Sequence, residues 1–273
     1  MDWRFTLLWG LWAVLLAPAA IAESTDCANP DIIVADGRQN LSTFAAPLPG
    51  KSNTTYWYGF FGQSGHSYSV EFVSPSDNDP IRNDTTVAFN SFQVWGPKDV
   101  LISCGGNSSV SKVATYSYSP VLMRTPGYGD GERFSFVASS SGLYLMTMSN
   151  SGGTGGYSFR VVDTTLFNPR WSTWTGYDSQ WGFMNLSDMD IPGTLSVYDL
   201  TGKLLKTVSM TIPAGAIVQR FTGSSDLKLP RNTSGYAIFT HTGPPGALLA
   251  DAYMLNGDAT VVIAAKFEVR APQ

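Results

Sequence analysis

Only two histidines are available for chemistry in this 273-residue chain, His66 and His241. A hydrolase triad needs a serine held against a histidine that a carboxylate orients. Serines are abundant and Asp251 can lie near His241 across a hairpin, but no Gly-x-Ser-x-Gly elbow occurs. Because a Gly-Pro-Pro turn follows His241 closely, we interpret this residue as a hydrogen-bond donor that caps the turn. Asp and Glu residues are present, but their spacing in the sequence does not identify two that would act as the carboxylate pair of a glycosidase. A secreted hydrolase is therefore the least favoured function class.

Residues 76–85 are rich in carboxylate and amide side chains and form the best candidate for a metal site. Hard oxygen ligands of this kind suit calcium. The spacing does not match an EF-hand, and no glutamate closes the set. The alternative is a solvated turn rich in Asp and Asn. No other cofactor is expected, and the candidate calcium ligands are Asp77, Asp79, Asn83 and Asp84.

Four aromatic residues within a short polar stretch form the most prominent binding candidate: Trp171, Trp174, Tyr177 and Trp181. Flat aromatic rings on a rigid scaffold offer a stacking surface for a sugar ring or an extended polymer. The alternative, which we favour, is that these side chains form the interface between two domains, because so much apolar area is rarely left in water.

Two cysteines, Cys27 and Cys104, are present. An even number of cysteines in an exported chain predicts a disulfide. This bridge would contribute at most about 4–5 kcal/mol by closing a long loop. The alternative is two free buried thiols. A zinc site is not expected, because neither cysteine has a nearby cysteine or histidine.

Residues 1–22 have the pattern of a cleaved signal peptide. Arg4 supplies a charged start, an apolar stretch follows, and Ala20-Ile21-Ala22 matches a small-x-small cleavage site. The alternative is an uncleaved membrane anchor, although the apolar stretch is short for a full span. No later segment qualifies as a transmembrane helix. We therefore expect an exported protein, either secreted or held in the periplasm or at the outer surface.

The composition excludes two classes of protein. With 43% hydrophobic and 13% aromatic residues, the chain is too apolar for a disordered protein. With 17 lysines and arginines and a net charge of −4, it lacks the basic surface that a nucleic-acid binder needs.

Apolar and polar residues alternate through most of the mature chain, which is the pattern of half-buried β-strands. No amphipathic helix is evident. Many short strands separated by turn residues predict an all-β protein of two β-sandwich domains. We place the domains at residues 23–163 and 171–273, with residues 164–170 as a linker, because Asn168-Pro169 signals a turn. The predicted strands are 39–45, 56–61, 67–73, 91–95, 100–104, 112–118, 132–138, 143–149, 156–162, 180–186, 193–199, 204–211, 216–222, 235–241, 247–254 and 260–269.

The first half resembles the bacterial pre-peptidase C-terminal domain family over residues 40–163. Tyr56-Trp57-Tyr58-Gly59-Phe60 and Gly65-His66-Ser67-Tyr68-Ser69-Val70 look like the aromatic hairpin of that family. Residues 134–136, 141–145 and 155–161 look like its last three strands. The resemblance implies a jelly-roll-like sandwich of the kind that accompanies secreted enzymes. In contrast to that family's pattern, we expect no protease domain before it.

The second half resembles an uncharacterised module of secreted bacterial proteins. The likeness rests on Arg170-Trp171-Ser172-Thr173, Leu195-x-Val197-Tyr198-Asp199 and the stretch from His241 to Ala252. It implies an immunoglobulin-like sandwich at a bacterial surface and no reaction.

The sequence therefore predicts an exported, non-catalytic binding or adhesion protein of the bacterial surface or matrix. Its partner would be a polysaccharide or a surface protein. The main alternative is a structural protein that self-associates by pairing the edge strands of its sandwiches.

Overall fold

The computed structural model describes residues 24–25, 29–44, 54–73, 89–95, 115–118, 132–150, 155–174, 176–258 and 261–269. Several predictions fall outside these residues. They are the signal peptide, both cysteines, the calcium loop with Asp77, Asp79, Asn83 and Asp84, and the strand at 100–104.

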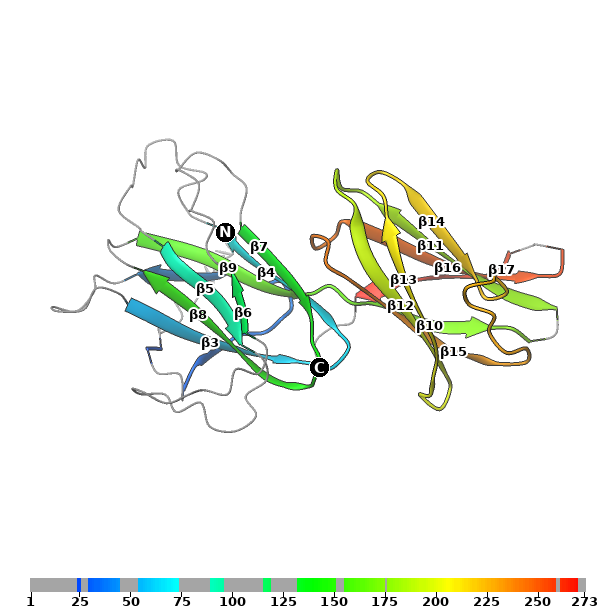
Figure 1. Cartoon of the computed structure of the whole chain (residues 1–273), viewed down its shortest axis with the longest axis horizontal. Helices are drawn as coiled ribbons and strands as arrows, with labels where there is room; N and C mark the ends of the chain where they lie inside the picture. The colour runs from blue at the N-terminus through cyan, green and yellow to red at the C-terminus, as the bar shows by residue number, and fades with distance from the viewer. Residues whose placement is uncertain are drawn as a thin grey trace, which may run out of the picture.

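Every regular element in the described part of the chain is a β-strand, which confirms the predicted all-β class. Figure 1 shows two layered units joined by a short connection. In the first unit, one sheet has the order β1-β3-β8-β5-β6 and the other β2-β9-β4-β7. Their bounds are β1 Asp31–Ile32, β2 Asn40–Phe44, β3 Thr54–Gly62, β4 Ser67–Val73, β5 Phe89–Trp95, β6 Thr115–Tyr118, β7 Glu132–Val137, β8 Gly142–Asn150 and β9 Gly155–Asp163.

Aromatic side chains fill the space between the sheets of this first sandwich. Alternate residues of β3 and β4 point inward, as the sequence pattern predicts. Tyr58 and Phe60 are fully buried, and Tyr68 lies against Phe60 with ring centroids 5.5 Å apart. Phe159 of β9 packs on Tyr58 at 4.6 Å. These contacts join the two sheets into one core.

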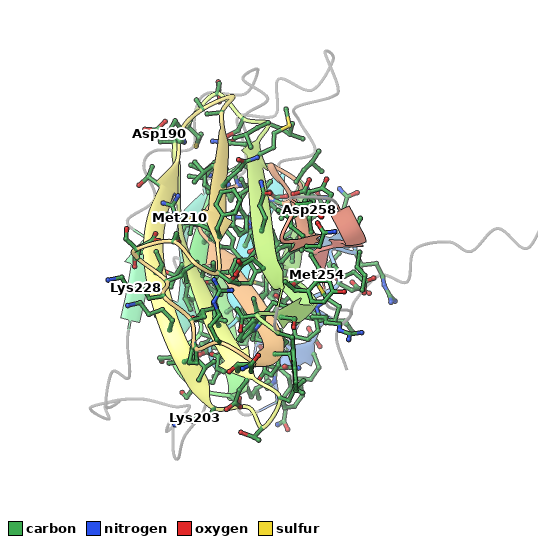
Figure 2. The ribbon with its side chains drawn as sticks, turned by 90° about the vertical axis from the view of Figure 1, so that its right-hand side faces the viewer. Asp190, Lys203, Met210, Lys228, Met254 and Asp258 are labelled. Atoms are coloured by element: carbon green, nitrogen blue, oxygen red, sulfur yellow. The ribbon has the colours of Figure 1, made fainter. Side chains whose placement is uncertain are left out.

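The second sandwich has one sheet of order β13-β12-β15-β10-β18 and another of order β14-β11-β16-β17. Figure 2 shows these two layers, with Met210 on the layer of β13 and Met254 on that of β16. The bounds are β10 Leu166–Ser172, β11 Tyr177–Asn185, β12 Ile191–Asp199, β13 Leu204–Ile212, β14 Ile217–Phe221, β15 Ser234–His241, β16 Leu248–Asn256, β17 Val261–Lys266 and β18 Glu268–Val269.

The predicted linker at residues 164–170 is wrong in its extent, because β10 begins at Leu166 and pairs with β15 and β18. Asn168-Pro169 does not make a turn. The register with β15 shifts between Asn168 and Trp171, so the proline falls at a bulge, where a missing N–H does not interrupt the ladder. Only Thr164 and Thr165 separate β9 from β10, and both are buried.

The last predicted strand, residues 260–269, is two strands in different sheets. β17 pairs with β16, and β18 pairs with β10 in the opposite sheet. Phe267 lies at the break, is buried in the core, and donates its N–H to the carbonyl of Ala250. The chain thus crosses from one layer to the other at Phe267.

Candidate functional site

Both histidines lie at the junction of the two sandwiches. His66 stands just before β4, and its Nδ1 is 2.8 Å from Oδ2 of Asp163 at the end of β9. The other carboxylate oxygen of Asp163 accepts the N–H of Thr165 at 3.0 Å. All three residues are buried. The pair therefore holds the turn before β4 against the connection into the second sandwich.

Ser67 continues this polar cluster toward the second sandwich. The hydroxyl of Thr164 donates to Ser67 Oγ at 3.0 Å, and the backbone N–H of His241 approaches the same oxygen at 3.4 Å. The Nδ1 of His241 accepts the N–H of Gly243 at 3.1 Å. The pKa of His241 is lowered to about 4, chiefly by burial and to a smaller extent by the positive charge of Arg133, while a hydrogen bond to the Thr164 backbone opposes the shift. His241 is therefore neutral at pH 7.

The cluster contains serine, histidine and aspartate but is not arranged as a catalytic triad. The bonds of Ser67 Oγ run to Thr164 and to a backbone N–H, and His241 uses its Nδ1 for the turn. His241 thus caps the turn as an acceptor, where the sequence predicted a donor. Asp251 does not approach it across a hairpin, because β15 and β16 belong to opposite sheets.

A groove of about 460 Å³ opens beside this cluster. Val137 of β7 forms part of its wall, and hydroxyl side chains of β12, β13, β15 and the turn after β15 form most of the rest. His241 lies at this groove but is buried, with its Nδ1 already bonded. The groove thus offers neutral hydroxyls, chiefly those of Thr194, Ser209, Thr211, Thr240 and Thr242.

The structure separates the four predicted aromatic site residues into two pairs. Trp171 and Trp181 have no exposed surface and belong to the core of the second sandwich. The indole N–H of Trp171 donates to the carbonyls of Tyr198 and Tyr236, and that of Trp181 to Oδ1 of Asn168. The predicted ligand-binding role is wrong for Trp171 and Trp181, and so is a role at the interface between the sandwiches, because both lie inside one sandwich.

Trp174 and Tyr177 remain on the surface, 56% and 37% exposed. A tight turn joins them, with the N–H of Tyr177 donating to the carbonyl of Trp174 at 2.7 Å. Gly176 supplies the left-handed φ of +81° that this turn requires. The hydroxyl of Ser172 accepts the N–H of Trp174 at 3.3 Å, which anchors the turn to β10.

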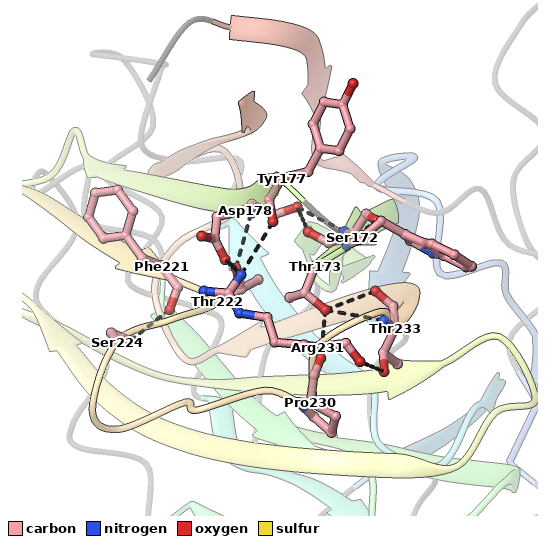
Figure 3. Close-up of polar contacts among 12 residues, drawn as sticks. Ser172, Thr173, Tyr177, Asp178, Phe221, Thr222, Ser224, Pro230, Arg231 and Thr233 are labelled. Atoms are coloured by element: carbon pink, nitrogen blue, oxygen red, sulfur yellow. Dashed lines mark hydrogen bonds and ion pairs between the residues drawn. The ribbon is translucent and has the colours of Figure 1, made fainter. Parts of the chain in front are cut away.

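An ion pair lies next to this turn (Figure 3). Nη1 of Arg231 is 2.7 Å from Oδ1 of Asp178, and the same oxygen accepts the hydroxyl of Thr222 at 2.9 Å. Thr173 Oγ1 donates to the carbonyl of Pro230 at 2.6 Å and so fixes the loop that carries Arg231. Figure 3 shows the rings of Tyr177 and Phe221 on two sides of Asp178.

The outer face of the β14-β11-β16-β17 sheet continues from this ion pair. Gln180 of β11 is the register partner of both Phe221 on β14 and Tyr253 on β16. The three side chains therefore stand in one row across the sheet, with Phe221 40% exposed and the other two half-buried. We call Trp174, Tyr177, Phe221 and Tyr253 together the aromatic surface.

Gly182 and Asp251 occupy the next row of this outer face. A Cβ at position 182 would lie 2.3 Å from Oδ1 of Asp251, so the glycine leaves room for the carboxylate over the middle of the sheet. The hydroxyl of Tyr253 donates to Oδ2 of Asp251 at 2.8 Å. This bond and the carboxylate charge raise the pKa of Tyr253.

Sequence reasoning missed Phe221, Gln180 and Tyr253 as site residues. Each lies in a strand that the alternation predicted, at a position that faces away from the core. Only the register of β11 with its two neighbours brings them together.

Within the described residues, no group of three or more His, Cys, Asp or Glu side chains is placed to hold a metal ion. The same part of the chain contains no helix that could span a membrane.

No family model and no curated protein matches the chain. Among solved structures, it is similar to the full extracellular region of zebrafish Gpr126/Adgrg6, at 8% identity and a TM-score of 0.26, over 86% of this chain and 38% of that one. It is also similar to a glycosyl hydrolase family 2 member from Bacteroides cellulosilyticus (11% identity, TM-score 0.18, 81% and 30% covered) and to Bacteroides uniformis beta-glucuronidase (12%, 0.17, 79% and 26%). The chain spans less than two fifths of each of these proteins. Likenesses with TM-scores this low carry no information about activity.

Proposed function

We propose that this chain is an exported, non-catalytic binding protein of the bacterial surface or matrix, and that it binds a polysaccharide through the aromatic surface. The observation that carries the proposal is the row formed by Phe221, Gln180 and Tyr253 on an open sheet face. Two aromatic rings separated by two strand spacings stand about 10 Å apart, comparable with the length of two sugar rings in an extended chain. The amide between them offers a donor and an acceptor to sugar hydroxyls.

The rigidity of the scaffold supports this function. The aromatic surface stands on a paired sheet and on a turn held by backbone hydrogen bonds. A preformed surface avoids most of the entropy cost of ordering side chains upon binding. The junction cluster supports a non-catalytic role. His66 pairs with Asp163, but Ser67 Oγ is bonded to Thr164 and to the backbone of His241, and Nδ1 of His241 is bonded to Gly243, so the groups do not form a triad.

The test is a screen of the purified chain against an array of immobilised polysaccharides and matrix proteins. We expect saturable binding to a polysaccharide by a stable monomer. Phe221→Ala and Tyr253→Ala should each weaken this binding about tenfold, as expected for loss of one stacking contact.

The matched control for these variants is Leu200→Ala. Leu200 is also apolar and 75% exposed, but it lies in the turn after β12. A blank array from folded protein, together with concentration-dependent assembly in light scattering, would contradict the proposal and favour the edge-pairing alternative. Repeating the screen with calcium and with a chelator tests the separate prediction for Asp77, Asp79, Asn83 and Asp84.

A further inference from the structure

The charged groups described around the aromatic surface are held by an ion pair and by hydrogen bonds. Asp178 is bonded to Arg231 at 2.7 Å, with side chains 40% and 60% exposed. Asp251 on β16 accepts a hydrogen bond from the hydroxyl of Tyr253. The positive charge of Arg231 is therefore already balanced by Asp178, and it offers little attraction to an anionic polymer.

The two central carboxylates are held in place and still have acceptor capacity. Thr222 and Arg231 both donate to Oδ1 of Asp178, and Tyr253 donates to Oδ2 of Asp251. Among the described side chains, no hydrogen bond reaches Oδ2 of Asp178 or Oδ1 of Asp251. An ionised carboxylate has several lone-pair sites, so each group can accept a further hydrogen bond from a sugar hydroxyl.

Gly182 determines where one of these acceptors lies. A Cβ at position 182 would lie 2.3 Å from Oδ1 of Asp251. Glycine therefore leaves free the space that this carboxylate occupies, in the row next to Gln180 and Tyr253. The atom that a new Cβ would meet is the end of a flexible side chain. An alanine at this position would therefore displace the carboxylate while leaving the backbone pairing of β11 and β16 intact.

We infer that the aromatic surface takes a neutral polysaccharide, a chain of uncharged sugar rings, whose hydroxyls donate hydrogen bonds to Asp251 and Asp178 while its rings stack on Phe221 and Tyr253. The inference rests on the proposed function and narrows it to one class of glycan. An anionic glycan would place its carboxylates or sulfates against Asp251 and Asp178. A cationic glycan would have to compete with Arg231 for Asp178.

The experiment compares three soluble polymers by affinity electrophoresis: a neutral glucan, mannan or xylan, the anionic polygalacturonate, and the cationic chitosan. We expect retardation by a neutral polymer alone, with a dissociation constant that changes less than twofold between about 0.05 and 0.5 M NaCl. Retardation by a charged polymer alone, lost at the higher salt concentration, would overturn the inference and leave polysaccharide binding intact. Retardation by none of them would overturn both.

Two variants test the residues. Asp251→Ala should weaken binding of the neutral polymer about tenfold, the effect of losing one charge-assisted hydrogen bond. Gly182→Ala should weaken it as well, with the thermal midpoint nearly unchanged. Asp188→Ala is the control, because Asp188 is an exposed carboxylate in the loop between β11 and β12. Wild-type affinity in both test variants would overturn the role of Asp251.

Discussion

His66 and Asp163 are 97 residues apart in sequence, yet Nδ1 of the histidine lies 2.8 Å from the carboxylate. Their bond joins the start of β4 to the end of β9, at the point where the chain passes into the second sandwich. Thr165, the residue just before β10, donates its N–H to the same carboxylate. One buried aspartate thus fixes both a turn of the first sandwich and the connection that follows it.

Removing this carboxylate should destabilise the protein. Asp163→Ala would leave the His66 ring N–H and the Thr165 N–H buried without their acceptor, at a cost of about 2–4 kcal/mol. Guanidinium denaturation followed by circular dichroism measures this loss. Asp188→Ala, which changes an exposed carboxylate, should stay within about 0.5 kcal/mol of wild type. Equal stability of the two variants would show that the Asp163 contacts contribute nothing.

His241 should make stability depend on pH. Its pKa is about 4 in the folded protein, against an ordinary value of 6.5. As the pH falls from 7 to 4, the unfolded chain takes up a proton that the folded chain does not, so stability decreases by about 3 kcal/mol. Above pH 7 the histidine is neutral in both states and has no such effect.

The variant His241→Gln isolates this contribution from that of the carboxyl groups. The free energy of unfolding of the wild type, measured relative to that of the variant, should fall by about 3 kcal/mol between pH 7 and pH 4. If the plots of unfolding free energy against pH are parallel for the two proteins, the pKa of His241 is not lowered in the folded state.

Trp181 and Trp174 should respond to substitution in opposite ways. Trp181→Ala leaves a large cavity in the second core and should cost about 3–5 kcal/mol. Trp174→Ala removes an exposed ring and should change stability by less than about 0.5 kcal/mol while weakening polysaccharide binding. Thermal melts and the array measure both effects. If Trp174→Ala lowers stability but leaves the affinity for the polysaccharide unchanged, Trp174 does not contribute to binding.

Two glycines provide a matched pair of substitutions. A Cβ at Gly235 would lie 1.9 Å from the carbonyl oxygen of Tyr198, so Gly235→Ala must push β15 away from β12, at a cost of about 3 kcal/mol. Gly215 has a φ of +66° and open space around it, so Gly215→Ala should cost only about 1 kcal/mol of backbone strain. Thermal denaturation of the two variants shows which one loses more stability. The reverse order would contradict the pairing of β12 with β15.

Alternation alone located most strands, because both sandwiches bury one face of every sheet. It failed at β10, where Asn168-Pro169 resembles a turn but forms a bulge inside a strand. It also could not separate Trp181 from Trp174. Burial of an aromatic ring depends on the phase of its strand, and Ser179, Trp181 and Phe183 share the inward phase of β11.

The aromatic surface itself could not be predicted from sequence. Phe221 and Tyr253 are far apart in the chain and meet only because β14 and β16 flank β11. Strand order and register decide this arrangement, and neither is readable from local patterns. Trp174 and Tyr177 were found because they are close in sequence.

Hydroxyl-radical footprinting of the chain, alone and with the tightest-binding neutral polysaccharide, tests the central claim most directly. Mass spectrometry then reports the oxidation of each side chain. We predict protection of Trp174, Tyr177, Phe221 and Tyr253, with Leu200 unchanged. Protection confined to the junction groove around Val137 and Met210, or to the first sandwich, would contradict the account.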